Sequence, residues 1–296
     1  MFKDILIGTL IRANDKTASY VEQILEHGFE SFAITFGGKF EIDPAELAEK
    51  VMPIVEANNI RIGAISLYGN PLTDDEKGEK AREEFSRLID CAHLFKTDVV
   101  TGFTGRVPGC PIPESIPKFK EVWGKLADQA GEKNLRIAWE NCPMGGDWKK
   151  GEHNIAHNPR AWELMFEALP VKNIGLEWEP CHQMVQLIDP MPQLREWVEK
   201  IFHIHGKDAT VFKDVVRKYG ISTDKEFAIH RHPGFGDCNW TDIISELRRA
   251  KFKGCINIEG WHDKAYSGEL EMTGQVFALN YLKKCRGDKF VENPKV

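Results

Sequence analysis

The stretch GLEWEPCHQM, residues 175–184, decides how the fold is interpreted. Leucine and tryptophan alternate in it with Glu177 and Glu179, and His182 follows shortly after. A period of two indicates a strand whose two faces meet different surroundings. Burying two carboxylates on one face of an apolar strand is costly unless they are bound by partners. The stretch therefore predicts a strand that delivers charged groups to a functional site.

Similar short apolar or β-branched segments recur along the whole chain. The predicted strands are residues 5–10, 31–36, 61–68, 98–105, 136–142, 174–180, 202–208 and 255–261. Each is followed by a segment that can form a helix; Asp43, for example, is expected to cap a helix that begins at Pro44. Strands that alternate with helices indicate parallel pairing through crossover helices.

Eight strand–helix units in a chain of this length predict a single (β/α)8 TIM barrel. We expect the barrel to span residues 1–285 and a polar C-terminal tail to span residues 286–296. The alternative is a doubly wound open sheet, but no GxGxxG motif follows the first strand, which disfavours its nucleotide-binding version. The long connection at 209–238 is expected to be functional or mobile.

Composition narrows the class of protein. The formal net charge of −6 argues against a nucleic-acid partner, because phosphate binding needs a basic face. No apolar run reaches the roughly 18–20 residues of a membrane span, and MFKDILIGTL at the N-terminus is interpreted as a first strand instead of a signal peptide. The seven cysteines include no CxxC motif, so we expect free thiols and a cytoplasmic location.

Four consecutive predicted strands end in side chains that can bind metals: Glu140, Glu179, His205 and Glu259. Alternation along each strand points all four toward the barrel axis, where catalytic groups of such barrels gather. Three converging carboxylates would repel one another without a cation, so the pattern predicts one bound divalent metal. The oxygen-rich ligand set favours Mn2+, and Mg2+, Co2+, Fe2+ and Zn2+ remain alternatives.

Other charged residues lie close to this set. Glu177 and His203 should lie one layer lower on adjacent strands, and we hypothesise that they pair beneath the metal and hold its ligands. Lys207 and Asp208 follow the seventh strand directly. The sequence leaves two alternatives open for them, a part in the site or a place as loop charges.

Several motifs together resemble the xylose isomerase-like TIM barrel superfamily, which is the sugar phosphate isomerase/epimerase group related to the AP endonuclease 2 family. These motifs are WEN (139–141), EPCH (179–182), HIHGKD (203–208), HPGFGDCNW (232–240) and INIEG (256–260). The resemblance implies a TIM barrel and the same four metal ligands. One departure is Glu179, where the family pattern usually has Asp, so its carboxylate is expected to be displaced or to bind in a bidentate manner.

The resemblance also implies roles for site residues. Glu140 and Glu259 would serve as the catalytic acid/base pair, and His182 would contact substrate oxygens and take part in catalysis. Arg231 is the nearest counterpart of the substrate-binding arginine that follows the seventh strand in the family. Tyr68 and Trp148 are added as substrate-contact candidates because of their places at or beyond strand ends.

The implied activity is that of a metal-dependent isomerase or epimerase. It would abstract a proton α to the carbonyl of a keto sugar or polyol through a metal-bound enediolate. The first alternative is a lyase of the same family, which would eliminate from a 3-oxo-glycoside, as the catalytic subunit of a C-glycoside deglycosidase does, or dehydrate a keto-inositol. More distant alternatives are an AP endonuclease-like DNA repair enzyme and a non-catalytic sugar-binding barrel. We expect a small-molecule carbohydrate substrate and a homo-oligomer, or a hetero-oligomer with a small subunit in the deglycosidase case.

Overall fold

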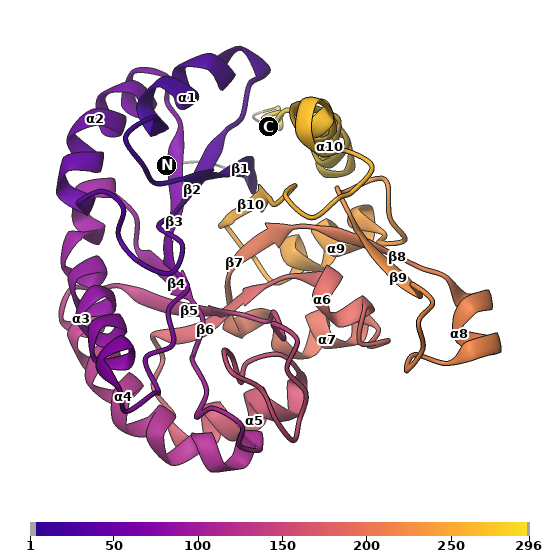
Figure 1. Cartoon of the computed structure of the whole chain (residues 1–296). Coiled ribbons are helices and arrows are strands. Elements are labelled where there is room, and N and C mark those ends of the chain that lie inside the picture. The colour runs from indigo at the N-terminus through magenta and orange to yellow at the C-terminus, as the bar shows by residue number, and fades with distance from the viewer. Residues whose placement is uncertain (1–3, 295–296) are drawn as a thin grey trace.

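A computed structural model describes residues 4–294 and shows a closed barrel of eight parallel strands (Figure 1). Around the barrel the strands follow the order β1-β10-β7-β6-β5-β4-β3-β2. The strands are β1 Leu6–Arg12, β2 Ser31–Thr35, β3 Arg61–Leu67, β4 Val99–Gly102, β5 Arg136–Glu140, β6 Ile174–Trp178, β7 Ile201–Gly206 and β10 Cys255–Ile258. The predicted (β/α)8 barrel is confirmed.

Helices enclose the barrel and join successive strands (Figure 1). They are α1 Thr17–Ile24, α2 Pro44–Ala57, α3 Glu76–Cys91, α4 Ile112–Glu132, α5 Pro159–Ala168, α6 Pro180–Met184, α7 Pro190–Trp197, α9 Trp240–Arg249 and α10 Glu271–Arg286. The predicted start of α2 is confirmed, because the Asp43 carboxylate accepts hydrogen bonds from the backbone N–H groups of Ala45 and Glu46. The apolar layer between the strands and these helices forms the main core.

Strand β6 shows how alternation separates this core from the barrel interior. Its outward-facing Trp178 is fully buried, and its indole N–H donates to Gln193 Oε1 of α7 over 2.7 Å. Gly175 leaves no room for a side chain, since a Cβ there would meet the carbonyl oxygen of Lys200 at 2.2 Å. This close contact packs β6 against the chain just before β7. Glu177 and the following Glu179 therefore point into the barrel.

The long connection after β7 contains an insertion that the sequence did not reveal. Strands β8 Asp208–Val211 and β9 Ala228–Arg231 pair in an antiparallel manner on either side of α8 Lys213–Tyr219. The insertion projects away from the barrel wall (Figure 1). Its base is held by Asp208, whose carboxylate accepts from the backbone N–H of Cys238 over 3.0 Å and from the indole N–H of Trp240 over 3.0 Å.

The cysteines and the helices can be compared with what the composition predicted. All seven cysteines are free, as predicted. Within residues 4–294, no helix has both the length and the apolar character that crossing a bilayer requires. Helix α10 ends at Arg286, whose buried guanidinium binds Glu30 Oε1 over 2.9 Å and donates to the Ile5 carbonyl over 2.7 Å, which attaches the helix end beside β1.

Candidate metal centre

The structure brings the four predicted ligands together at the C-terminal end of the barrel. Their potential ligand atoms all lie within 4.8 Å of one another, and all four side chains are buried. His205 Nδ1 is 3.4 Å from Glu179 Oε2, 3.2 Å from Glu259 Oε2 and 4.0 Å from Glu140 Oε2. We call Glu140, Glu179, His205 and Glu259 the quartet.

The quartet fits a divalent metal ion. Among the described residues, Glu179 Oε1 and Glu259 Oε2 are buried without a well-aligned hydrogen bond, although buried carboxylate oxygens are normally satisfied. Three carboxylates and one imidazole form a donor set that Mn2+, Fe2+, Mg2+ or Co2+ accepts. The residues present therefore match the expectation of a metal site.

Lys207 belongs to this centre and is not a loop charge. Its side chain is 2% exposed, and its ammonium lies 3.0 Å from Glu259 Oε1 and 3.1 Å from Glu179 Oε1. In each of these carboxylates, Oε1 faces Lys207 and Oε2 faces His205. Both oxygens of Glu179 are therefore engaged: Oε1 contacts Lys207, and Oε2 is the oxygen directed toward His205.

A buried network lies beneath the quartet. The predicted contact between Glu177 and His203 is confirmed, with 2.7 Å between Glu177 Oε1 and His203 Nδ1. The same oxygen is 3.1 Å from His205 Nε2, and the Tyr68 hydroxyl donates to Glu177 Oε2 over 3.2 Å. Burial alone would raise the pKa of Glu177, but the neighbouring His205 and His203 outweigh it and lower that pKa to about 2. Glu177 thus orients His205, so that Nδ1 faces the other ligand atoms.

The two carboxyl groups that face the cavity differ in proton affinity. Burial, reinforced by the negative charges of Glu259 and Glu177, raises the pKa of Glu140 to about 7 despite the opposing effect of His205. Burial also acts to raise the pKa of Glu259, but the neighbouring Lys207, His205 and His262 hold it well below its usual range. A pair of carboxyl groups with separated pKa values is a common arrangement for acid–base catalysis.

His182 stands beside the quartet on the short helix α6. Its Nε2 is 3.1 Å from Glu179 Oε1 and 3.6 Å from Glu140 Oε1. Burial lowers the pKa of His182 to about 4, although the nearby Glu179 acts in the opposite direction. A neutral imidazole in this place can exchange hydrogen bonds with the oxygens of a bound ligand.

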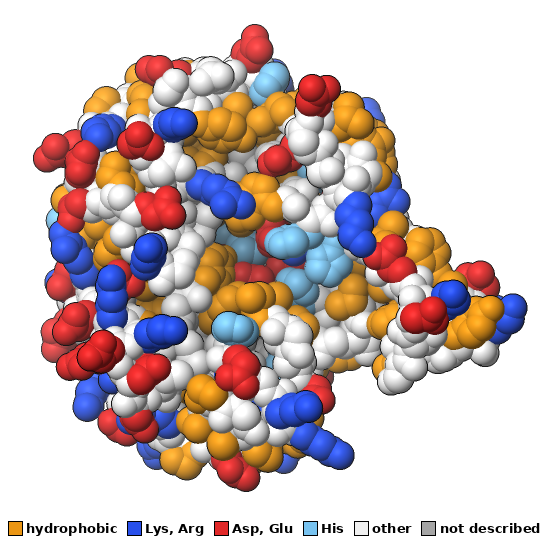
Figure 2. All heavy atoms as spheres, viewed as in Figure 1, with side chains coloured by type: hydrophobic (Ala, Val, Ile, Leu, Met, Phe, Trp, Pro, Cys, Tyr) orange, Lys and Arg blue, Asp and Glu red, His pale blue; other side chains and the backbone are white. Residues whose placement is uncertain are grey.

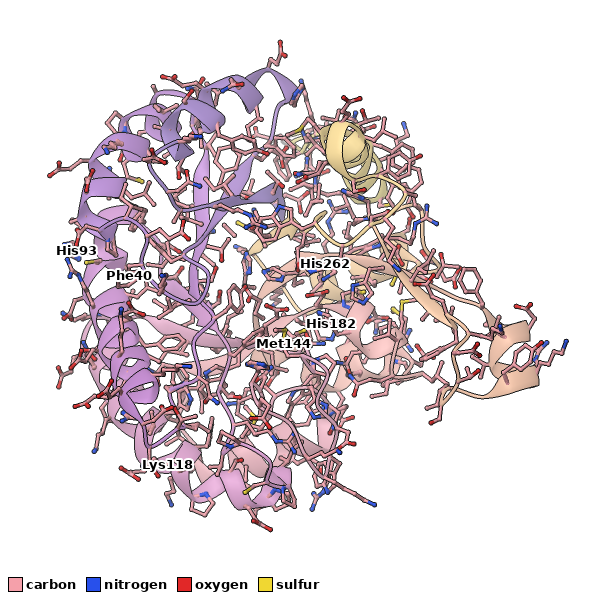
Figure 3. The ribbon with its side chains drawn as sticks, viewed as in Figure 1. Phe40, His93, Lys118, Met144, His182 and His262 are labelled. Atoms are coloured by element: carbon pink, nitrogen blue, oxygen red, sulfur yellow. The ribbon has the colours of Figure 1, made fainter. Side chains whose placement is uncertain are left out.

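A cavity of about 880 Å3 opens above these residues. Figure 2 shows histidine side chains gathered around the hollow and carboxylates at its floor. In the side-chain view, His182, Met144 and His262 lie toward the centre of the molecule, whereas His93 and Lys118 lie out on the helical layer (Figure 3). The lining includes Leu10, Arg12, Asn14, Thr35, Phe36, Glu41, Tyr68, Phe103, Glu140, Cys142, Met144, His182, Val185, Lys207, His230, Glu259, Trp261 and His262.

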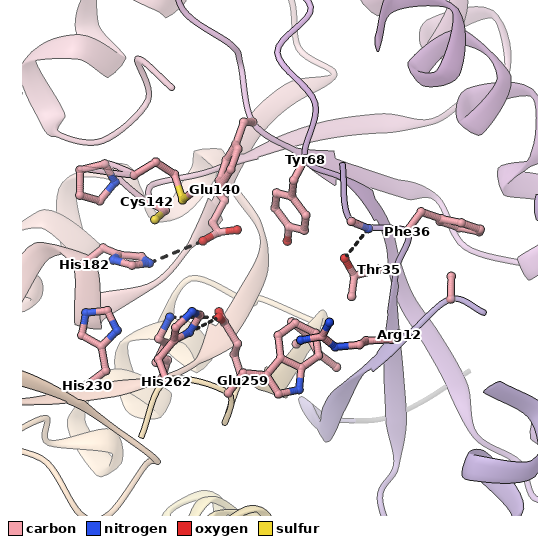
Figure 4. A pocket seen from close by; sticks show the side chains of 18 of the residues that line it. Arg12, Thr35, Phe36, Tyr68, Glu140, Cys142, His182, His230, Glu259 and His262 are labelled. Atoms are coloured by element: carbon pink, nitrogen blue, oxygen red, sulfur yellow. Dashed lines mark hydrogen bonds and ion pairs between the residues drawn. The ribbon is translucent and has the colours of Figure 1, made fainter. Parts of the chain in front are cut away.

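The residues expected to contact substrate fall into two groups. Tyr68 and His182 line the cavity (Figure 4). Arg231 and Trp148 lie outside the lining. Arg231 is held by Asp263, with 3.2 Å between its Nε and Oδ2. Trp148 is half-buried and packs against the core.

Some lining residues were missed by sequence reasoning. Arg12 at the end of β1, His230 on β9, and Trp261 and His262 beyond β10 all line the cavity. His262 Nδ1 is 3.1 Å from Glu259 Oε1. Three of them could have been found from their places in the sequence. Arg12 lies at the end of the first strand, and Trp261 and His262 directly follow the INIEG motif of the last strand. His230 gave no such signal, since it comes from the inserted hairpin.

Comparison with known proteins agrees with this architecture. The chain is 22% identical over 262 residues to the uncharacterised protein YfiH of Bacillus subtilis, covering 80% of this chain and 83% of that one. It is 25% identical over 187 residues to an inosose dehydratase of Clostridium tetani, covering 59% of this chain and 58% of that one.

Solved structures share the fold at low sequence identity. The 3-keto-D-glucoside 4-epimerase YcjR of E. coli superposes with a TM-score of 0.71 at 14% identity, covering 95% of this chain and 100% of that one. The family model described as "Xylose isomerase-like TIM barrel" matches residues 21–285, which include the whole quartet. The chain belongs to the xylose isomerase-like TIM barrel family.

Proposed function

We propose that this protein is a divalent-metal-dependent isomerase or epimerase that moves a proton α to the carbonyl of a keto sugar or polyol. The observation that carries the proposal is the quartet itself, with two of its carboxylates, Glu140 and Glu259, lining an open cavity. The names of a related dehydratase and a structurally similar epimerase support the same substrate class. Mn2+ is the first choice of ion, and a homo-oligomer remains a prediction.

The cavity residues have separate proposed roles in proton transfer and in substrate binding. Glu140 and Glu259 both line the cavity, and as a pair they would remove the α-proton and return it. His182 and Tyr68 line the same cavity and hold substrate oxygens. When bound, a divalent ion supplies Lewis-acid polarisation of the carbonyl, worth several kcal/mol.

A lyase is the second candidate. The similarity to an inosose dehydratase favours it, because elimination begins with the same α-proton abstraction and then expels a leaving group from the β-carbon. The two candidates are separated by the product: an isomerised or epimerised sugar keeps its atoms, whereas a dehydrated or deglycosylated one loses water or its aglycone.

The test follows proton exchange in deuterated water. Mn2+-loaded protein is incubated with a panel of ketoses, keto-inositols and oxo-glycosides, and loss of the α-proton signal is followed by NMR. We expect exchange with at least one class, reduced at least 100-fold in Glu140→Gln and in Glu259→Gln. Glu163→Gln, at an exposed position on α5, is the matched control. Equal exchange rates in all four proteins would contradict the proposal.

A further inference from the structure

The cavity has two distinct parts. Glu140, His182 and Glu259 form its reactive side, and Arg12, Thr35 and Phe36, at the ends of β1 and β2, lie on the opposite side (Figure 4). Pockets for drug-sized ligands span about 300–1,000 Å3. At about 880 Å3, this cavity has room for a sugar ring at the quartet and a further group beside β1.

Arg12 marks the second part, nearer the mouth. Strands β1 and β10 pair in parallel with Thr9 opposite Ile258. Arg12 is the last residue of β1 and is exposed, and Trp261 lies in the turn after β10, two residues beyond Glu259. The guanidinium carbon of Arg12 lies 4.6 Å from the centroid of the Trp261 ring. This cation–π contact holds the guanidinium in place without using any of its N–H donors.

The charge of Arg12 is available to a ligand. Apart from histidines, two cationic side chains line the cavity, Lys207 and Arg12. Lys207 is engaged by two carboxylates of the quartet. Among residues 4–294, no ion pair and no hydrogen bond involves the Arg12 guanidinium, although Glu41 lines the same cavity. A pre-organised, unpaired guanidinium is suited to bidentate recognition of a carboxylate or phosphate.

We propose that the mouth of the cavity is a subsite for an anionic substituent of the substrate, and that Arg12 is the residue that selects it. The substrate class is then a keto sugar or polyol that carries a carboxylate or phosphate away from its reacting carbons. The identity of the reacting end rests on the proposed function, but binding at Arg12 does not require turnover.

The test compares matched ligands by isothermal titration calorimetry. Fructose is compared with fructose 6-phosphate, and glucose with glucuronate, on metal-free and Mn2+-loaded protein. We expect the anionic member of at least one pair to bind about tenfold tighter or more, as one charge-assisted bidentate contact provides. Arg12→Met, which keeps the side chain's length and loses its charge, should abolish the preference, and Arg12→Lys should retain part of it. Arg160→Met, on the exposed face of α5, is the control.

The outcomes separate an anion subsite at Arg12 from anion binding at the metal. A preference that Arg12→Met removes from both metal-free and loaded protein supports the subsite, even if no α-proton exchange is found and the proposed function fails. A preference that persists in Arg12→Met overturns the proposal, and if that preference is seen only with Mn2+, it assigns the anion to the metal. Equal affinities within both pairs overturn it as well.

Discussion

Within the candidate metal centre, Lys207 contacts one oxygen of each of two carboxylates in the quartet. Lys207 takes Oε1 of Glu179 and Oε1 of Glu259, while Oε2 of each faces His205. In metal-free protein, this ammonium and the neighbouring His205 offset the charge of the buried carboxylates. We expect Lys207→Met to lower the free energy of unfolding of metal-free protein by about 3–5 kcal/mol, the usual cost of stranding a buried charge.

The same variant separates charge balance from packing. A saturating concentration of Mn2+ supplies positive charge at the quartet, so the loss in Lys207→Met should shrink when unfolding is measured with the ion present. Lys80→Met, at an exposed position, serves as the control. A loss of equal size with and without Mn2+ would show that Lys207 acts through packing alone.

Glu177 is expected to act on the metal through His205. Since its Oε1 lies 3.1 Å from His205 Nε2, Glu177→Gln should weaken the hold on that imidazole. Loss of such a supporting carboxylate typically lowers metal affinity about 10–100-fold. Competition against a fluorescent chelator gives the Mn2+ dissociation constant. If the Mn2+ dissociation constant and the thermal stability of Glu177→Gln were both unchanged, Glu177 would have no supporting role at the metal site.

His230 makes stability depend on pH. Burial, with nearby Lys207, lowers its pKa to about 3, against 6.5 for an ordinary histidine. Between these values the unfolded chain binds a proton that the folded chain does not, so stability falls as pH drops below 6.5. At pH 5 this contribution is about 2 kcal/mol. We expect His230→Gln to lose correspondingly less unfolding free energy between pH 7 and pH 5 than the unaltered protein.

Chemical denaturation of metal-free protein at the two pH values measures that difference. His93→Gln, at an exposed position, should show the same loss as the unaltered protein. If His230→Gln were as acid-sensitive as the unaltered protein, the acid-induced loss would come from other groups.

Among the elements, the β8–α8–β9 insertion is held at its base by several hydrogen bonds to Asp208. The Asp208 carboxylate accepts from the backbone N–H groups of Ala209 and Cys238 and from the indole of Trp240. Hydrogen bonds to a charged group are worth about 1.5–3 kcal/mol each. We expect Asp208→Ala to destabilise the protein by about 2–4 kcal/mol, measured by urea unfolding.

The effect of Asp208→Ala should be local as well as global. Because the insertion carries His230 to the cavity, hydrogen exchange should increase first in β8 and β9. Asp214→Ala, within α8, gives a comparison for the same insertion. Unchanged exchange in the hairpin, or a loss below 0.5 kcal/mol, would contradict this role of Asp208.

For the whole molecule, the eight strand–helix units were enough to predict the barrel, and period-two alternation along the strands predicted the convergence of the quartet. Residues such as Glu179 and His205 lie on or directly after regular strands, where side-chain direction follows from position. The same logic placed Glu177 beside His203. These parts of the site were accessible from sequence because the closed barrel brings the ends of all its strands to one rim.

Other parts of the site could not be derived in this way. Lys207 directly follows β7 with the same alternation as His203 and His205, but a lysine at a strand end is equally compatible with a loop charge, so its role stayed open. His230 reaches the cavity through a hairpin within a long connection, and Arg231, the candidate predicted from family resemblance, turns instead toward Asp263. Loop geometry depends on tertiary contacts such as those of Asp208, which have no periodic signature in the sequence.

The central claim is that the quartet holds one divalent ion, and metal content tests it most directly. Plasma mass spectrometry of purified protein should find about one Mn, Fe, Co, Mg or Zn per chain, and Glu259→Gln, which removes one of the four ligands, should retain much less. Differential scanning fluorimetry with added Mn2+ should show a rise in melting temperature in the unaltered protein and a smaller rise in the variant. No bound metal and no ion-dependent shift, or equal metal content in both proteins, would contradict the account.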